Sequence, residues 1–481
     1  MTAKWAIFFY LVPRDPENRT NLDVRAKRVR DEIVRLARKY PRDLRIAYRL
    51  APSGPNPAER VVVGETLDTR MVEDEVYDPG DPTALGKFLR WAHENGCVGQ
   101  RCAVFFWGHG WGPAGLFSLE DLELLGLVAP NAAPVIAPAQ SPQPANAPAA
   151  GVHAAYPIVP GLEVRANARF AVIRRPDGIR LHMPAHGIAR HHNDYVIYPA
   201  MPHGAFAEVP HRTTTTVVNL ASGLKTLARL RGTPVDLALF QCCWVSNLES
   251  AHQLRGELNA MIGSQTLVPI LQNPWPYERL FKVMMGTSSL TEASLKRLTG
   301  QLVRILGQWH TLQNQRRPIT ALNTRDVSVA PAFADLVRAL KLTTPAGQAL
   351  NFEHLYSNAP RRDRKNGLYR TENSGLIDVL RLCEDLQQAH RAPSVIAAAR
   401  TLEKAVTENL ILAHHTPDPK LYRGATVYYQ PSQTTIDWLK LPTHSDNASI
   451  KWLLPHEYSY LSFVRASKWG AFAFEMDGLT V

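Results

Sequence analysis

Short apolar runs alternate with amphipathic stretches over residues 5–264 of the chain. An apolar run of strand length without a helical repeat is typical of a buried strand, and apolar residues that recur every three or four positions indicate a helix with one buried face. Strands that alternate with helices build a parallel sheet covered on both faces. The pattern therefore predicts an α/β fold, with strands at 5–12, 44–50, 102–107, 235–240 and 261–264 and helices that begin near Asn21, Asp81, residue 215 and residue 247.

Two of these helices carry boundary signals. Asp81 followed by Pro82 is typical of a helix start, because a carboxylate caps the free N–H groups and proline fits the first turn. Gly96 and Gly232 stand where the apolar repeats stop, as glycine does after a helix. These signals predict helices that end before each glycine.

A long insertion separates the strand at 102–107 from the next helix of the core. Residues 129–160 contain eight prolines, many alanines and no charged residue, which is the composition of a low-complexity linker. The following stretch, 161–213, is rich in arginine and histidine and has strand-like pieces such as 168–173. We therefore expect an insertion over 120–213 that lies outside the core.

Beyond residue 290 the pattern becomes mainly helical. Helical repeats cover 298–312, 333–342, 376–389 and 397–412, and 426–430 is strand-like. The sequence thus predicts a core over 1–290, which contains the insertion, and a mainly helical C-terminal region over 291–481. Whether that region is packed on the core or flexibly attached is left open.

Composition narrows the class of protein. The 45% of hydrophobic residues and 20% of charged residues are ordinary for soluble globular chains. The net charge of +11 is roughly one charge per forty residues, too dilute to indicate a nucleic-acid partner. Its excess of basic residues falls in 161–213 and 291–481, so the core is nearly neutral. We expect no specific nucleic-acid partner.

The cysteines and the apolar runs predict a cytoplasmic protein. Five cysteines are too few and odd in number for a disulfide framework, which favours free thiols in a reducing compartment. The run at 5–12 lacks the flanks and the cleavage site of a signal peptide, so a buried strand is the better interpretation. Because no apolar stretch reaches the roughly 18 residues that cross a bilayer, we expect no membrane partner.

Candidate chemistry follows two of the predicted strands. His109 lies in Trp107-Gly-His-Gly110, and Cys243 follows Gln241 and Cys242. Ligands bind at the carboxyl ends of parallel strands, and if these two strands are neighbours, the imidazole could assist the thiol in attacking an acyl carbon. The glycines beside His109 would let an amide reach the developing oxyanion. The alternative is a buried thiol pair and a histidine in a glycine turn.

Two cofactor sites fit the sequence poorly. Residues 110–115 match the G-x-G-x-x-G dinucleotide fingerprint, but no acidic residue occurs between Glu123 and Glu163 to hold a ribose. Seven histidines lie in the insertion, yet His182-x-x-x-His186 contains Pro184 and no cysteine assists, which disfavours a zinc site. We therefore expect neither a cofactor nor a metal.

The motifs together resemble the clostripain family of cysteine peptidases, which are related to caspases and gingipains. The resemblance begins with Trp107-Gly-His-Gly110, with Phe240-Gln-Cys-Cys243 and with Glu249. It extends over nearly the whole chain except roughly 120–213, because further motifs follow in the family's order: the strand at 5–12 with Asn21-Leu22, Gly80-Asp-Pro-Thr-Ala-Leu85, Gly263-Ser-Gln265, Pro269, Trp275, Tyr277, Ser328-Val-Ala330, Ile377-Asp378 and Val427-Tyr-Tyr-Gln-Pro431.

The resemblance implies a caspase-like, mostly parallel sheet flanked by helices, and a Cys-His dyad. Cys243 would be the nucleophile, His109 the general base and acid, and the backbone amides of Gly110 and Cys243 the oxyanion hole. Cys242 stands where the family has a small residue, which implies a filler beneath the site. A calcium requirement is left open.

The substrate pocket departs from the family. Clostripain-like enzymes cleave after arginine or lysine with the help of acidic side chains, and the corresponding places here are Gln241, Gln272 and Asn273, followed by Trp275. A buried cationic side chain would lack its charge partner, so a neutral or polar residue before the scissile bond is as well supported.

These observations predict a cytoplasmic cysteine endopeptidase that hydrolyses protein or peptide substrates through an acyl-thioester on Cys243. Two interpretations of the insertion stay open: it covers the site until it is cleaved or displaced by a regulatory protein partner, or it is a solvated surface loop. A non-catalytic adaptor of the same fold, binding a peptide or an acidic partner, is the alternative. The pair His109 and Cys243 argues against the adaptor, and the lost acidic pocket argues for it.

Overall fold

The computed structural model describes most of the core and of the C-terminal region. Side chains are described for residues 2–13, 22–52, 57–73, 81, 83–110, 216–269, 273–287, 290–315, 317–343, 355, 376–389, 392–429 and 461–470, and only the backbone of short strands is described within 116–215 and at 361–370.

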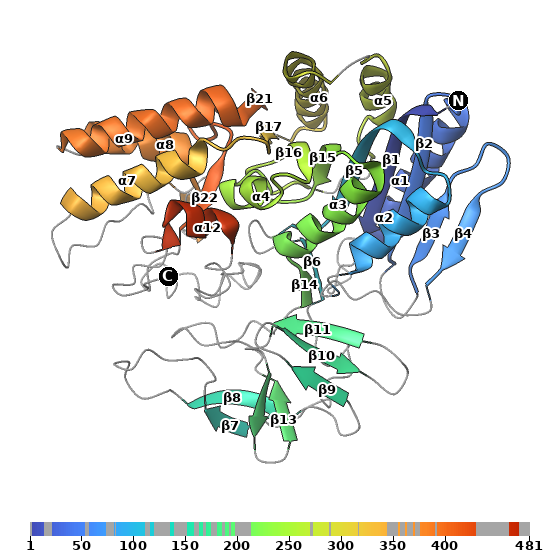
Figure 1. The fold of residues 1–481 in the computed structure, drawn as a ribbon, viewed down its shortest axis with the longest axis horizontal. Helices are drawn as coiled ribbons and strands as arrows, with labels where there is room; N and C mark the ends of the chain where they lie inside the picture. Colours follow the sequence, from blue (N-terminus) through green and yellow to red (C-terminus); the bar gives the residue numbers. More distant parts are fainter. Residues whose placement is uncertain are drawn as a thin grey trace.

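A nine-stranded sheet forms the centre of the molecule (Figure 1). Its five central strands are parallel to one another, and two antiparallel strands extend it at each edge. The strands follow in the order β21 (Ile411–His415), β17 (Ile319–Asn323), β16 (Leu258–Gly263), β15 (Val235–Gln241), β5 (Gly99–Gly108), β1 (Ala3–Val12), β2 (Leu44–Leu50), β3 (Glu59–Val62) and β4 (Thr69–Val72).

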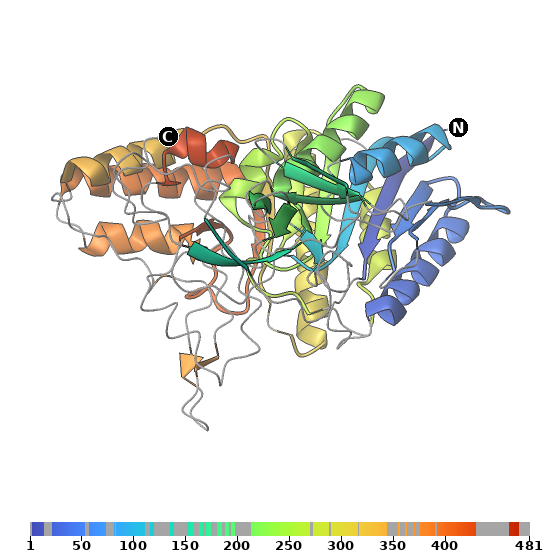
Figure 2. The same cartoon turned by 90° about the horizontal axis from the view of Figure 1, so that it is seen from below.

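Helices cover both faces of this sheet, as the sequence predicts. One face packs against α1 (Leu22–Lys39), α5 (Tyr277–Met285) and α6 (Glu292–Leu312). The other packs against α2 (Ala84–Glu94), α3 (Val217–Arg231) and α4 (Leu248–Gln253). Figure 2 shows α1 and α2 on opposite sides of the N-terminal strands. The predicted α/β architecture is therefore confirmed.

Local chemistry sets the helix ends. Thr216 accepts a hydrogen bond from the N–H of Asn219 and caps α3, and Gly232 ends it with φ of 73°. The helix predicted to begin near residue 247 is α4, which has only six residues. It ends at Gln253, because Gly256 takes a φ of 91° that turns the chain into β16.

The C-terminal region contributes strands as well as helices. Besides β17 and β21 it contains α7 (Val329–Thr343), α8 (Val379–Ala389), α9 (Pro393–Lys404), a π-helical turn at Ala405–Leu410 and α12 (Ser462–Ser467). The strands β20 (Leu376–Asp378) and β22 (Thr426–Tyr428) pair with each other. The helix predicted over 397–412 is wrong at its end, because residues from Ile411 onward pair with β17 instead.

The side chains of this region pack on the core. Phe333, Val395 and Trp469 belong to the same buried cluster as Phe8 and Leu224. This contact settles the question that the sequence leaves open: the described C-terminal helices are packed against the core. Within the described ranges, no helix is both long and apolar enough to cross a membrane.

Short antiparallel strands form the described backbone of the insertion. They lie beyond the pair formed by β6 and β14, apart from the central sheet (Figure 1). Two of them, β7 and β8, pair within the range predicted as a linker. The strands are β6 (Leu116–Leu119), β7 (Val135–Pro138), β8 (Val152–Pro157), β9 (Glu163–Ala166), β10 (Phe170–Arg174), β11 (Arg180–Pro184), β12 (Ile188–His191), β13 (Asp194–Ile197) and β14 (Thr213–Thr215), and β18 (Arg361–Arg362) and β19 (Tyr369–Arg370) form a further pair in the C-terminal region.

Candidate active site

The strands that precede His109 and Cys243 are direct neighbours in the sheet. β5 and β15 run parallel, and Trp107 pairs with Gln241 in their register. His109 and Cys243 each follow two residues later, so both leave the carboxyl edge of the sheet at the same level. The neighbouring strand ends predicted from the sequence are therefore confirmed, and this edge is where parallel sheets bind ligands.

Glycine at position 110 brings the histidine segment against the backbone of Cys243. A Cβ atom built on Gly110 would lie 2.4 Å from the carbonyl oxygen and 2.6 Å from the nitrogen of Cys243. It would also lie 2.9 Å from the Cβ of Cys242. Because real Cβ atoms do not approach backbone atoms so closely, only glycine fits here. His109 and Cys243 are both half-buried, so the site is partly open to solvent.

The two adjacent cysteines have different environments. Cys242 is fully buried, its thiol lies 3.6 Å from the carbonyl oxygen of Phe106, and burial raises its pKa well above the ordinary value. Cys97, Cys102 and Cys383 are buried too, and burial likewise raises the pKa of each thiol. Cys243 is half-buried, which makes it the most accessible of the five free cysteines. Cys243 is therefore the thiol that a molecule from solvent reaches most easily.

The loop after β16 lies against Cys243. The N–H of Val268 donates to Sγ of Cys243 at 3.2 Å, which stabilises a thiolate, and the thiol form can donate to the carbonyl of Val268 at 3.8 Å. The N–H of Trp244 donates to the carbonyl of Thr266 at 3.0 Å. Trp244 has a φ of 56°, a left-handed conformation that a bulky residue adopts only when its surroundings hold it there.

The segment after Cys243 is attached to the C-terminal region. The carbonyl of Ser246 accepts hydrogen bonds from the N–H of Thr426 at 3.0 Å and from its hydroxyl at 3.1 Å. Glu249 is fully buried, and its carboxylate accepts the N–H of Tyr428 at 2.7 Å. Glu249 thus has a structural contact with β22, so its place in the motif series reflects packing of the C-terminal region on the nucleophile segment.

The residues predicted to bind substrate lie at different depths. Gln241 is 3% exposed and accepts a hydrogen bond from the hydroxyl of Tyr277 at 3.2 Å. Trp275 is buried, whereas Asn273 is exposed and donates to the side-chain oxygen of Gln313 at 3.1 Å. Gln272 lies outside the described residues. The structure therefore buries Gln241, two residues before Cys243 in the chain, and leaves Asn273 on the surface.

The surroundings of Gln241 carry no acidic side chain from the loop that follows β16. Residues 264–277 contain neither Asp nor Glu. Tyr277, the partner of Gln241, stays neutral because burial raises the pKa of its hydroxyl, with a further contribution from the charge of Glu32. The sequence did not reveal this tyrosine contact, because the motif that contains Tyr277 gives no sign of which strand it faces.

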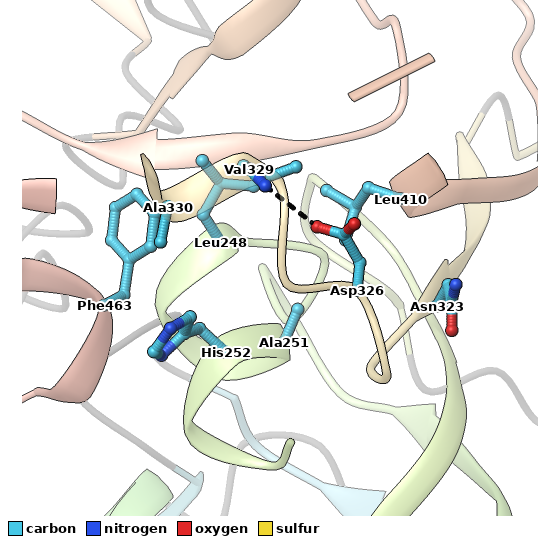
Figure 3. Close-up of a pocket in the computed structure, with 9 residues that line it drawn as sticks. All are labelled: Leu248, Ala251, His252, Asn323, Asp326, Val329, Ala330, Leu410 and Phe463. Atoms are coloured by element: carbon cyan, nitrogen blue, oxygen red, sulfur yellow. Dashed lines mark hydrogen bonds between the residues drawn. The ribbon is translucent and has the colours of Figure 1, made fainter. Parts of the chain in front are cut away.

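A small pocket of about 20 Å³ lies between α4 and α7, and neither His109 nor Cys243 lines it (Figure 3). There Asp326 accepts the N–H of Val329 and caps α7, and His252 contacts the hydroxyl of Ser462 at 2.8 Å. Burial lowers the pKa of His252 to about 4, so its ring is neutral near pH 7. Among the described residues, no three His, Cys, Asp or Glu side chains gather to hold a metal.

Gly110→Ala should destabilise the protein. The added methyl group meets backbone atoms, so we expect the free energy of unfolding to fall by about 1–3 kcal/mol in urea titrations. Gly286→Ala is the matched control, because its new Cβ would have its nearest neighbour at 3.4 Å in helical backbone, and we expect a change within about 0.5 kcal/mol. Equal stability of Gly110→Ala and wild type would contradict the close approach of the two segments.

Comparison with known proteins identifies the fold. No protein-family model and no curated protein sequence matches the chain. Two solved structures, both of a secreted C11 cysteine protease from Bacteroides thetaiotaomicron, match at TM-scores of 0.51 and 0.50. Each is 11% identical in sequence and aligns over 97% of this chain and 99% of its own length, and one of them is in complex with an irreversible peptide inhibitor. The chain therefore has the caspase-like fold of the C11, or clostripain-like, cysteine proteases.

Proposed function

We propose that this protein is a cysteine endopeptidase with Cys243 as nucleophile and His109 as general base and acid. The observation that carries the proposal is the packing of Gly110 on the backbone of Cys243, because it holds the histidine segment beside the one accessible thiol. The fold shared with C11 cysteine proteases supports the same chemistry. Since one of these proteases carries a peptide inhibitor, we infer that a peptide substrate lies along the same sheet edge.

In the proposed reaction, His109 takes the proton of the Cys243 thiol and the sulfur attacks the scissile carbonyl carbon. The N–H groups of Gly110 and Cys243 would stabilise the oxyanion, where each donor contributes about 10²- to 10³-fold in rate. The C–N bond then breaks, and the leaving amine takes the proton from His109. Water, deprotonated by His109, hydrolyses the acyl-thioester and releases the second product and the free thiol.

Removal of either dyad side chain should abolish hydrolysis. Cys243→Ala and His109→Ala should lower kcat/KM for a cleaved peptide by about 10⁴-fold or more, because the two groups act as a unit. Cys242→Ala is the matched control: this thiol is buried, so activity should stay near wild type. Full peptidase activity in Cys243→Ala would refute the assignment.

A non-catalytic adaptor that binds a peptide is the second candidate. It is favoured by the absence of acidic residues from the loop at 264–277. The same peptidase assays distinguish it, together with a peptidyl electrophile: an adaptor would leave Cys243 unlabelled, and a peptidase would be labelled at Cys243.

For a peptidase, we propose a neutral, polar side chain before the scissile bond. Gln241 lies two residues before the nucleophile, and its oxygen is engaged by Tyr277, so the amide N–H groups are what it can offer a ligand. An arginine or lysine side chain at this depth would find no carboxylate from residues 264–277, and burying an unpaired charge costs several kcal/mol.

Gln241→Asp should change this preference. In a peptide library that varies the residue before the cut, wild type should cleave after neutral polar residues and discriminate against arginine and lysine. Gln241→Asp should raise kcat/KM for arginine and lysine substrates by about 10- to 100-fold, since it supplies the missing charge. Gln241→Leu is the control without charge and should give no such gain. Strong cleavage after arginine by wild type would contradict the proposal.

We also propose that the insertion over 120–213 controls access until it is cleaved or displaced by a regulatory protein. The strand that precedes it, β6, begins six residues after Gly110, so only a short stretch of chain separates the insertion from the histidine segment. A low-complexity linker with many small residues is a favourable place for cleavage.

Intact-mass measurements should reveal self-processing. Purified wild type should separate into fragments cut within 120–213, whereas Cys243→Ala should keep the full mass of 53.6 kDa. Addition of a trace of wild type to Cys243→Ala tests cleavage between molecules. Identical, uncut chains in both preparations would exclude self-processing.

A cytoplasmic location is a further part of the proposal, based on five cysteines that are all free thiols. The similar C11 proteases are described as secreted. No cofactor is assigned to the reaction, and a calcium requirement stays open.

A further inference from the structure

The loop formed by residues 264–268, here named the thiol-facing loop, makes four contacts with the nucleophile segment through its backbone. Its Val268 N–H donates to Sγ of Cys243 at 3.2 Å, and its Val268 carbonyl oxygen lies 3.8 Å from the same sulfur. Its carbonyl groups at Thr266 and Ser264 accept the N–H groups of Trp244 and Ser246, both at 3.0 Å. The position of this loop therefore decides whether an N–H points at the sulfur.

A buried glutamine connects the thiol-facing loop to the C-terminal region. Gln265 is fully buried, its amide nitrogen donates to Oδ2 of Asp378 at 2.8 Å, and its oxygen accepts the N–H of Gly424 at 2.9 Å. Both ends of the side chain are thus held by residues more than one hundred positions away. A side chain bonded at both ends fixes the backbone of its own loop.

Asp378 is the rigid partner in this contact. It is fully buried, and besides Gln265 it accepts the N–H groups of Leu380, Arg381 and Arg423 at 2.8–3.1 Å. Burial raises the pKa of this carboxyl, and the hydrogen bonds oppose that shift. Because its donors start α8 and precede Gly424, Asp378 ties Gln265 to two separate segments of the C-terminal region.

We propose that Gln265 is a positioning residue for the nucleophile: through Asp378 and Gly424 it fixes the thiol-facing loop so that Val268 N–H stabilises the thiolate of Cys243. A hydrogen bond to a charged group contributes more than one between neutral groups, and a small displacement of a donor weakens it steeply. The C-terminal region thereby sets the reactivity of a cysteine that lies on the core.

Two other titratable residues belong to the adjoining segments. His109 follows the end of β5, and Cys242 directly precedes Cys243 in the chain. Neither is bonded to Gln265, so a change at Gln265 leaves them in place. The proposal concerns the acidity of the thiol, and only its consequence for catalysis rests on the proposed function.

The test is the pH dependence of alkylation of Cys243 by iodoacetamide, followed by mass spectrometry of the peptide that carries it. Gln265→Met keeps the volume and removes both hydrogen bonds. We expect alkylation near pH 6.5 to slow by about three- to ten-fold, with the midpoint of the pH profile shifted upward and the rate near pH 10 unchanged. A purely structural role would change access to the thiol and lower the rate equally at both pH values.

Two further variants complete the experiment. Gln253→Met is the matched control, because this glutamine accepts the N–H of Ser462 at 3.0 Å and makes no described contact with the thiol-facing loop. Its profile should equal that of wild type. Asp378→Asn changes the acceptor of the Gln265 hydrogen bond. It should shift the midpoint of the alkylation pH profile in the same direction as Gln265→Met.

Three outcomes would overturn the proposal. The first is an unchanged midpoint in a folded Gln265→Met or Asp378→Asn protein, and the second is an equal loss of alkylation rate at both pH values. The third applies if both variants fail to fold: it is a wild-type midpoint at or above about 8.5, the pKa of free cysteine. Alkylation requires no peptide hydrolysis. A shifted profile in a protein without peptidase activity would therefore uphold the inference while refuting the proposed function.

Discussion

The contact between Gly110 and the backbone of Cys243 is the constraint on which the candidate site depends. Parallel pairing of β5 with β15 brings the two strand ends to one level, but strand pairing alone leaves a gap that side chains could fill. Because position 110 has no side chain, the histidine segment lies directly on the nucleophile segment. The candidate site is thus held together by contact between two backbone segments, one that carries His109 and one that carries Cys243.

Buried polar contacts give the C-terminal region a part in this arrangement. Glu249 and Gln265 are fully buried on the core, and each is bonded to backbone or carboxylate groups of residues 378–428. A buried carboxylate or amide without a hydrogen bond lowers the stability of the fold. These two side chains therefore stabilise the attachment of the C-terminal region to the core. The two strands β17 and β21, which complete the sheet, strengthen the same attachment. Through these contacts the segment that carries Cys243 is attached to residues far away in the sequence.

The candidate substrate pocket of this chain differs in charge from the pocket that the resemblance to clostripain-like enzymes implies. Amides stand where carboxylates would bind a cationic substrate side chain, and Gln241 is already bonded to Tyr277. The fold shared with C11 proteases therefore accounts for the scaffold, while the amides argue for a different substrate preference. A shared fold supports many specificities, because specificity depends on a few side chains near the nucleophile.

The sequence by itself determined the central strands, the helices α1, α2 and α3, and the strand ends that carry His109 and Cys243, because long apolar repeats and glycine or aspartate boundary signals are local properties. It missed β3, β4, β17 and β21, since antiparallel edge strands of four or five residues carry too little pattern, and it extended one helix into β21 for the same reason. The burial of Cys242 agrees with the filler that the resemblance implies. Only the tertiary structure decided that Tyr277 contacts Gln241 and that Gln265 bonds to Asp378. These contacts join residues 36 to 113 positions apart, and no local pattern encodes which distant partner a buried polar group will meet.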